Sequence, residues 1–181
     1  MYAIEPLGVV FPRDGDEAAA VVSTAARFGV PVLARGAGTS LAGQAVGRAV
    51  VMDFSRHMDR ILAIDAEARR ARVQPGVVQE QLNLAAARHG LMFGPDTSTS
   101  NRATLGGMIG NNSAGSHSVR YGMTVDHVLS LDVVLSDANR AAFGPLSAAE
   151  VASRGARPGL EGTICRELPL LADSSRSRPA W

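Results

Sequence analysis

The chain has 181 residues, a formal net charge of +1 and 46% hydrophobic residues, as an ordinary globular protein does. All 18 basic residues are arginine, which excludes a lysine Schiff base and the lysine of a nucleotide-binding P-loop. The near-neutral charge, the 4% of aromatic residues, the lack of a long apolar run and the single cysteine argue against nucleic acid, a membrane span and an internal disulfide. We therefore expect a cytoplasmic protein.

The first part of the chain predicts a strand, a helix and a second strand. Residues 9–12 form a short extended run, and Asp14 followed by Glu17 has the spacing of a helix-capping box. Gly29 is placed to end that helix, and residues 31–34 predict a buried strand. Apolar residues recur at helical spacing between these limits: Val21, Val22, Ala25 and Phe28.

Three more strands and a second helix follow. Residues 50–54 form an apolar strand, and residues 61–65 are expected to pair with residues 71–74 across a polar turn. A helix is predicted over residues 78–89, with Gly90 as its stop.

The composition changes over residues 94–122, where Gly, Ser, Thr and Asn dominate. A loop-like stretch of this length inside a compact domain is usually functional or disordered, and its interleaved apolar residues argue against disorder. Within it, a helix can start after Thr104. We expect this stretch to be functional.

The C-terminal part carries one strong signal. Residues 128–135 predict a strand, and residues 136–140 a turn that leads into a strand at residues 141–143. After Pro145 the pattern weakens, and residues 173–181 are expected to be a frayed tail.

A first glycine-rich segment, residues 34–40, directly follows a predicted strand, so its backbone N–H groups can converge on an anion. The nicotinamide dinucleotide fingerprint fails because Leu41 stands where its third glycine belongs. Gly38 and Gly43 have P-loop spacing, but Gln44 replaces the essential lysine. A pyrophosphate loop and a plain tight turn both remain open.

A second segment comprises residues 94–96 and 104–116, with little side-chain bulk and many hydroxyl and amide groups. A flat ring system can lie against such a backbone, while Thr, Ser and Asn offer neutral hydrogen bonds to ribose, phosphate and ring heteroatoms. The alternative interpretation is a glycine-rich helix-packing interface.

Four stretches carry a family resemblance: RGAGTSLAGQ (35–44), FGPD (93–96), TLGGMIGNN (104–112) and SHSVRYG (116–122). Together they resemble the PCMH-type FAD-binding domain of the vanillyl-alcohol oxidase and p-cresol methylhydroxylase superfamily. The residues of these four stretches are similar to those of the D-lactate and glycolate dehydrogenase branch, particularly members fused to an iron–sulfur domain. The resemblance spans about residues 6–171.

The resemblance implies an α+β domain over residues 1–171, with FAD between two subdomains. The first, about residues 1–55, is a small strand-helix-strand unit. The second, about residues 56–171, is a larger, mainly antiparallel sheet with helices and is truncated. Residues 172–181 are expected to be a frayed or non-native tail.

The same resemblance assigns FAD contacts to both glycine-rich segments, the first of which holds the pyrophosphate. The expected cofactor-binding residues are Arg35, Gly36, Ala37, Gly38, Thr39, Ser40, Gln44, Pro95, Asp96, Thr104, Gly106, Gly107, Gly110, Asn111, Asn112, Ser113, Gly115 and Ser116. Thr39 stands where some relatives carry a histidine that tethers the flavin, so noncovalent FAD is expected. Ala114 stands where many relatives carry a cysteine, and we expect this difference to have no effect on FAD binding.

Four side chains near the second segment have two interpretations each. His117 is the histidine worth testing for chemistry, whereas His127 is expected to make a structural hydrogen bond. Arg102 and Arg120 can meet a phosphate or a substrate carboxylate, or remain on the solvated surface. No catalytic residue and no metal ligand is assigned.

The function implied by the resemblance is oxidation of a 2-hydroxy acid, of the D-lactate or glycolate type, to the 2-oxo acid by hydride transfer to FAD. Electrons then pass to an iron–sulfur domain, a quinone or a cytochrome, and the complete enzyme is cytoplasmic or peripheral to the inner membrane. The substrate-binding cap of such enzymes lies beyond this domain. Three alternatives remain: an FAD-binding module that is inactive alone, a fragment that cannot close its flavin site, and a superfamily oxidoreductase for another alcohol, such as a sugar or a peptidoglycan precursor.

Overall fold

A computed structural model describes the backbone of residues 3–176 and the side chains of residues 3–172. The chain forms two compact units, Met1–Val128 and Leu129–Trp181. No helix of the described residues combines the length and the apolar character needed to cross a membrane.

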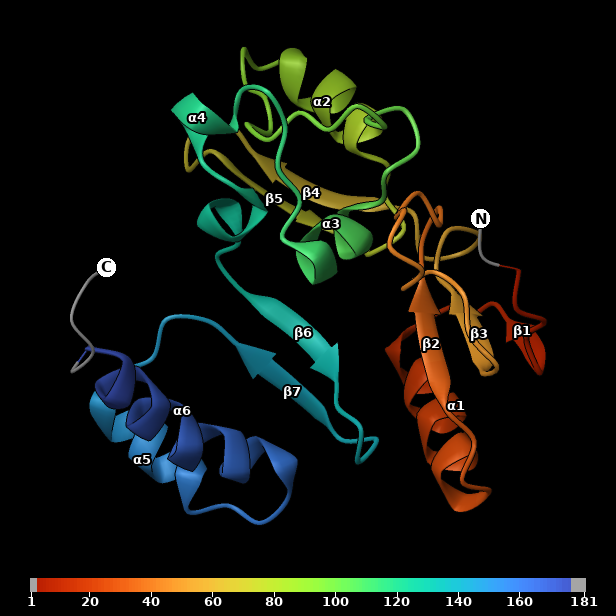
Figure 1. Cartoon of the computed structure of the whole chain (residues 1–181). Coiled ribbons are helices and arrows are strands. Elements are labelled where there is room, and N and C mark those ends of the chain that lie inside the picture. Colours follow the sequence, from red (N-terminus) through yellow and green to blue (C-terminus); the bar gives the residue numbers. More distant parts are fainter. Residues whose placement is uncertain (1–2, 177–181) are drawn as a thin grey trace. The chain divides into compact units, whose positions relative to one another are not determined.

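The first unit begins with a three-stranded parallel sheet. β1 (Gly8–Val10) and β2 (Val32–Arg35) pair on either side of β3 (Val50–Asp53), in the order β1-β3-β2 (Figure 1). Because all three strands run the same way, their carboxyl ends lie at one edge. Gly36 and Phe54 follow β2 and β3 at that edge, and Phe54 N–H donates to the Arg35 carbonyl at 3.0 Å.

Helix α1 (Gly15–Arg27) starts where the sequence predicts. The Asp14 carboxylate accepts hydrogen bonds from the N–H groups of Asp16 and Glu17, at 2.9 and 2.8 Å. The Glu17 carboxylate accepts from the Arg13 N–H at 2.8 Å and pairs with the Arg13 guanidinium. The predicted capping box therefore forms with one difference. The Glu17 carboxylate accepts from the N–H of Arg13 and not from the N–H of the N-cap residue Asp14.

The predicted apolar face of α1 is only partly buried. Ala25 is buried and Val21 and Val22 are half-buried, but Phe28 is 73% exposed. The helix ends one residue before Phe28, so this side chain leaves the helical register. Gly29 follows in the left-handed region with φ of 63°, which confirms it as the stop.

A hairpin and a helix build the main core of the first unit. β4 (Ile61–Asp65) pairs antiparallel with β5 (Arg70–Val73), and α2 (Gln79–Ala87) follows. Gly90, with φ of 67°, ends this segment as predicted. The buried core residues are Val77, Leu82 and Leu105, and Ile61, Val73 and Phe93 pack against them. This core joins the hairpin to α2 and to the second glycine-rich segment.

Residues 94–127 contain more helix than the sequence pattern indicates. α3 (Leu105–Asn111) begins after Thr104 as predicted, but α4 (Ser118–Tyr121) and the 3₁₀ helix η1 (Thr124–His127) were not predicted. These short turns lack the apolar repeat that marks longer helices, so periodicity cannot reveal them.

The second unit begins with an antiparallel hairpin. β6 (Leu131–Val134) pairs with β7 (Arg140–Phe143). A strand was predicted over residues 128–135, but β6 is shorter and begins at Leu131. The 3₁₀ helix η1 extends to His127, and residues 128–130 do not pair with another strand.

Two helices complete the second unit, and neither was predicted. α5 (Ala148–Gly155) begins with a capping box in which Ser147 Oγ accepts from Glu150 N–H at 3.3 Å and Glu150 accepts from Ser147 N–H at 2.7 Å. α6 (Leu160–Arg176) extends into the expected tail, so the first residues of that tail are helical. Residues 177–181 lie outside the described residues.

The α+β class is confirmed, with one change to the larger subdomain. In place of a single larger antiparallel sheet, the described residues form two separate two-stranded sheets, β4-β5 in the first unit and β6-β7 in the second. The domain limits inferred from the sequence stay predictions.

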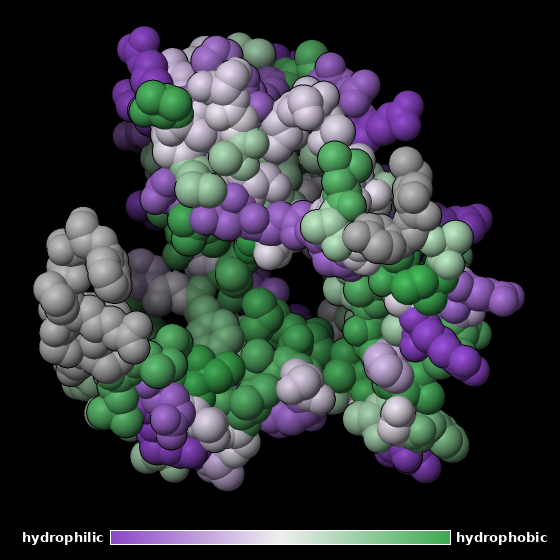
Figure 2. All heavy atoms as spheres, in the orientation of Figure 1, coloured by the Kyte–Doolittle hydropathy of each residue, from purple (hydrophilic) through white to green (hydrophobic). Residues whose placement is uncertain are grey.

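Apolar surface is conspicuous on the second unit. Figure 2 shows hydrophobic residues gathered over the part that contains β6 and β7. Large exposed side chains of this unit are Leu129, Leu168, Leu170 and Leu171, each more than half exposed. Exposed apolar surface of this kind marks contact sites or a tendency to associate.

Candidate functional site

The first glycine loop, residues 36–44, starts at the carboxyl edge of the parallel sheet, where β2 ends. Gly38 and Gly43 adopt φ of 69° and 91°, a backbone conformation that residues with a Cβ rarely adopt. Within the described part of the chain, the backbone N–H groups of residues 36–42 donate to no protein acceptor. A run of free N–H groups in such a loop can cradle an anion.

Arg35, the last residue of β2, adds a charged donor to this loop. A Cβ built on Gly38 would lie 2.6 Å from Arg35 Nη2 and 2.8 Å from Arg35 Nε, so a larger residue there would displace the guanidinium from its present position. Arg35 Nε is buried and has no hydrogen-bond partner, alone among buried side-chain nitrogens and oxygens of the described residues. A buried donor without an acceptor costs about 1–3 kcal/mol, so a bound phosphate oxygen here would stabilise the site. The loop therefore fits the pyrophosphate of a dinucleotide.

The two glycine-rich segments meet at the start of α3. A Cβ on Gly36 would overlap Thr104 Oγ1, so the loop lies directly against Thr104. Thr104 is 3% exposed and its backbone bridges to Val78. Gly106 is equally crowded, since a Cβ there would lie 2.7 Å from the Pro75 Cβ. Glycine at these positions allows the backbones to approach closely.

Asn111, at the other end of α3, joins the same two segments. Asn111 Nδ2 donates to Ser40 Oγ at 2.6 Å, and Gln44 Nε2 donates to Asn111 Oδ1 at 3.3 Å. Asn112 ends α3 in the left-handed region, with φ of 45°, and its Oδ1 accepts from the Val125 N–H at 2.9 Å. The two neighbouring asparagines therefore differ in role, since one contacts the first loop and the other holds η1.

Asp96 organises a second cluster. Its carboxylate accepts from Ser116 Oγ at 2.9 Å and from His117 N–H at 2.8 Å, and it lies 2.8 Å from His117 Nδ1. The His117 N–H, followed by the Ser116 hydroxyl and the charge of the His117 ring, lowers the pKa of Asp96. A Cβ on Gly115 would overlap the Asp96 carbonyl oxygen. Among the described residues, no hydrogen bond connects this cluster to the first loop.

Two more predicted residues serve the protein through their carbonyl groups. The carbonyl of buried Pro95 accepts from Gln79 Nε2, while Gln79 Oε1 accepts from Thr97 Oγ1 at 2.8 Å. The Ser113 carbonyl accepts from Thr124 Oγ1 at 2.7 Å. These bonds shape the backbone of the second segment.

The remaining predicted residues differ in their surroundings. Ala37 is exposed and Thr39 half-buried in the first loop. A Cβ on Gly107 would lie 3.2 Å from Thr104 Oγ1, whereas a Cβ on Gly110 would meet no atom within 4 Å. Protein neighbours therefore do not require glycine at position 110, and the surface of α3 is open there.

The structure also gives different surroundings to the four histidine and arginine side chains that the sequence left with two interpretations. His127 Nε2 lies 2.8 Å from the Tyr121 carbonyl, which can only accept, so this ring nitrogen donates as the structural role requires. Arg120 stacks over the Tyr121 ring, 5.4 Å from its centroid. Arg102 lines a pocket, and His117 faces Asp96.

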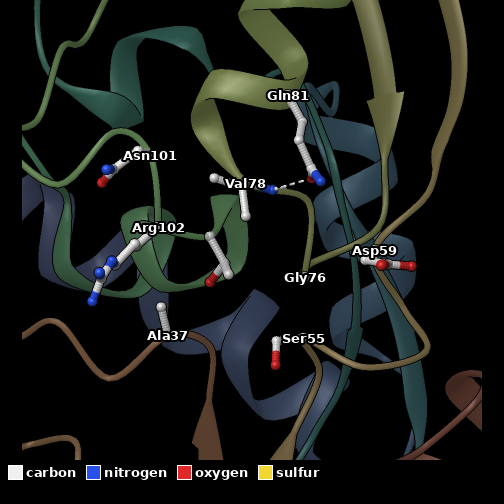
Figure 3. Close-up of a pocket in the computed structure, with 9 residues that line it drawn as sticks. Ala37, Ser55, Asp59, Gly76, Val78, Gln81, Asn101 and Arg102 are labelled. Atoms are coloured by element: carbon white, nitrogen blue, oxygen red, sulfur yellow. Dashed lines mark hydrogen bonds between the residues drawn. The ribbon is translucent and has the colours of Figure 1, made fainter.

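An open pocket of about 290 Å³ adjoins the junction of the two segments. Figure 3 shows Arg102 and Asn101 on one side of it and Asp59 on the other. Its lining residues are Ala37, Ser55, Asp59, Gly76, Val78, Gln81, Asn101, Arg102 and Thr104. Ala37, Arg102 and Thr104 were singled out from the sequence, and the other six were not.

Strand ends could have pointed to part of this pocket. Ser55 follows β3 at the carboxyl edge that also carries the first loop. Gly76 comes just before α2, and a Cβ on it would overlap the Phe54 carbonyl oxygen. The remaining lining residues come from segments whose spacing carries no such signal.

Comparison with known proteins gives a family and a fold. A family of FAD binding domains matches residues 6–141. D-2-hydroxyglutarate dehydrogenase of Pseudomonas putida is 44% identical over 169 residues, which cover 92% of this chain and 17% of that protein. Glycolate oxidase subunit GlcD of Escherichia coli K12 is 37% identical over 145 residues, which cover 79% of this chain and 29% of that protein.

Among solved structures, an alkyldihydroxyacetonephosphate synthase superposes with a TM-score of 0.66 at 24% identity, covering 78% of this chain and 29% of that chain. A likeness at this identity shows the fold alone. The chain spans less than a third of the length of each of these proteins.

Proposed function

The chain belongs to the family of FAD binding domains, and we propose that it forms the noncovalent FAD site of an oxidoreductase acting on a 2-hydroxy acid. The observation that carries the proposal is the donor set of the first loop. Backbone N–H groups over residues 36–42 and the buried Nε of Arg35 all lack protein acceptors, and a pyrophosphate supplies acceptors of the right charge.

Each glycine-rich segment has its own part in holding the cofactor. Arg35 and residues 36–40 hold the pyrophosphate, while α3 and the turn after it, through Ser116, offer neutral hydrogen bonds and an open backbone surface. FAD bound by these residues would supply the hydride acceptor for oxidation of a 2-hydroxy acid to the 2-oxo acid, while a base would take the proton of the substrate hydroxyl. Thr39 offers no imidazole for a covalent link, which supports a dissociable cofactor.

The names of the relatives support the substrate class. D-2-hydroxyglutarate and glycolate are both 2-hydroxy acids, and the proteins named after them match most of this chain. The chain spans only 17% of the first of these relatives, so turnover of a 2-hydroxy acid is proposed for the complete enzyme. The electron acceptor of the complete enzyme, an iron–sulfur domain, a quinone or a cytochrome, belongs to the same proposal.

The first test is the visible spectrum of the purified full chain after incubation with FAD and gel filtration. We expect a flavin spectrum in the protein peak and release of all flavin into the supernatant on acid denaturation. A folded, monodisperse sample without flavin would contradict FAD binding. Flavin that stays with the precipitated protein would contradict the noncovalent link.

A further inference from the structure

The first loop depends on few contacts for its shape. Within residues 36–44 and the turn that follows, the described backbone hydrogen bond is Val46 N–H to the Gly43 carbonyl, at 3.2 Å. The other described hydrogen bonds of the loop both involve Asn111. Gln44 Nε2 donates to Asn111 Oδ1, and Asn111 Nδ2 donates to Ser40 Oγ. A loop with two left-handed glycines and free N–H groups samples many shapes unless something outside it restrains it.

We propose that Asn111 is a positioning residue that holds residues 36–44 in the anion-binding shape before the cofactor arrives. The inference rests on the proposed function, since the ligand is the pyrophosphate of FAD. Restraining a loop in its bound shape lowers the ordering cost of binding, so affinity rises without any new contact to the ligand.

The chemistry of an amide suits this position. Asn111 donates from Nδ2 to Ser40 and accepts at Oδ1 from Gln44, so one side chain restrains the loop at two points. A carboxylate could accept from Gln44 but could not donate as the amide does, and it would place a negative charge beside an anion site. Asn112 cannot take over, because its Oδ1 accepts from the Val125 N–H.

The location of Asn111 separates loop positioning from fold stability. Both of its hydrogen bonds are solvent-exposed, whereas the core residues Val77, Leu82 and Leu105 are buried, Leu105 at the opposite end of α3. Loss of the side chain should therefore weaken FAD binding while the flavin-free chain still unfolds cooperatively, with only a small fall in its melting temperature.

The test uses the full chain with Asn111→Ala, and Asn139→Ala in the second unit as control. FAD affinity and dissociation rate are measured by flavin fluorescence. We expect Asn111→Ala to raise Kd about ten-fold, mostly through faster dissociation, as loss of two exposed hydrogen bonds implies. Asn139→Ala should bind as the unaltered chain does.

A double-mutant cycle tests whether Asn111 acts through the loop. If it does, the rise in Kd for Ser40→Ala combined with Asn111→Ala should be smaller than the product of the two single rises, and single rises that multiply would overturn the inference. Unchanged Kd and dissociation rate in Asn111→Ala would overturn it as well.

If Asn111→Ala does not fold, Gln44→Ala removes the 3.3 Å bond alone and should raise Kd about three-fold, while an unchanged value contradicts the inference. Failure of the unaltered chain to bind FAD would instead defeat the proposed function.

Discussion

At the scale of single residues, the site is defined by where side chains are absent. At Gly36 and Gly38, the space that a Cβ would take is occupied by side-chain atoms of Thr104 and Arg35, respectively. Glycine there has two separate tasks, since it leaves room for close contact and, at Gly38, permits the left-handed backbone.

Gly38→Ala should weaken FAD binding at least ten-fold, because a Cβ would lie 2.6 Å from Arg35 Nη2 and displace the guanidinium. Gly29→Ala is the matched control, since Gly29 has nearly the same φ, 63°, but no atom within 4 Å of a Cβ. Both changes should cost about 1–2 kcal/mol in urea unfolding, from left-handed strain. Equal FAD affinity in the two variants would show that Arg35 has no part in the site.

At the scale of elements, the structure is assembled from short pieces with capped starts. Asp14 caps α1 and Ser147 caps α5, and both lie at the sequence positions that capping rules favour. α5 could therefore have been predicted from Ser147 and Glu150, although the weak apolar pattern after Pro145 hid it.

Ser147→Ala should destabilise the second unit by about 1 kcal/mol, because the N–H of Glu150 loses its acceptor and Glu150 loses a donor. Urea unfolding followed by circular dichroism measures the change. Ser153→Ala, at an exposed position inside α5, is the control and should be neutral or slightly stabilising. A loss of the same size in both variants would mean that the cap contributes nothing of its own.

At the scale of the whole molecule, two carboxylates accept hydrogen bonds from segments that are distant in the chain, and protonation at low pH should weaken these contacts. The backbone N–H of His117 lowers the pKa of Asp96, and the backbone N–H of Leu160 lowers that of Asp137. A carboxyl group whose pKa is lowered by folding contributes stability above its unfolded pKa, and this contribution is lost as the pH falls through the folded value.

Asp96→Asn should therefore lose less stability than the unaltered chain when the pH falls from about 6 to about 3, because the variant no longer has this proton to take up. Urea midpoints across that range provide the measurement. Glu67→Gln, in the exposed turn between β4 and β5, is the control and should follow the unaltered chain. An identical acid response of Asp96→Asn and the unaltered chain would refute the role of Asp96.

Much of the molecule could be predicted from the sequence. Strands β1 to β5 and helices α1 to α3 of the first unit follow local patterns, namely apolar runs, an Asp cap and glycine stops, which act within a few residues and do not depend on the rest of the fold. The short helices α4 and η1 of the same unit carry no such pattern. The resemblance to FAD-binding domains is confirmed by the match over residues 6–141, and with it FAD as the cofactor. The individual FAD contacts stay predictions.

Other features depend on residues that are far apart in the chain. The class of fold, the two glycine-rich segments and the family can be predicted from residue types at short spacing in the chain. In contrast, tertiary packing brings Asn111 to Ser40 and Gln44, places Gly36 against Thr104, and sets Ser55 and Gly76 at the edge of a pocket. These contacts join residues brought together by packing, and no local propensity specifies which distant partner a side chain meets.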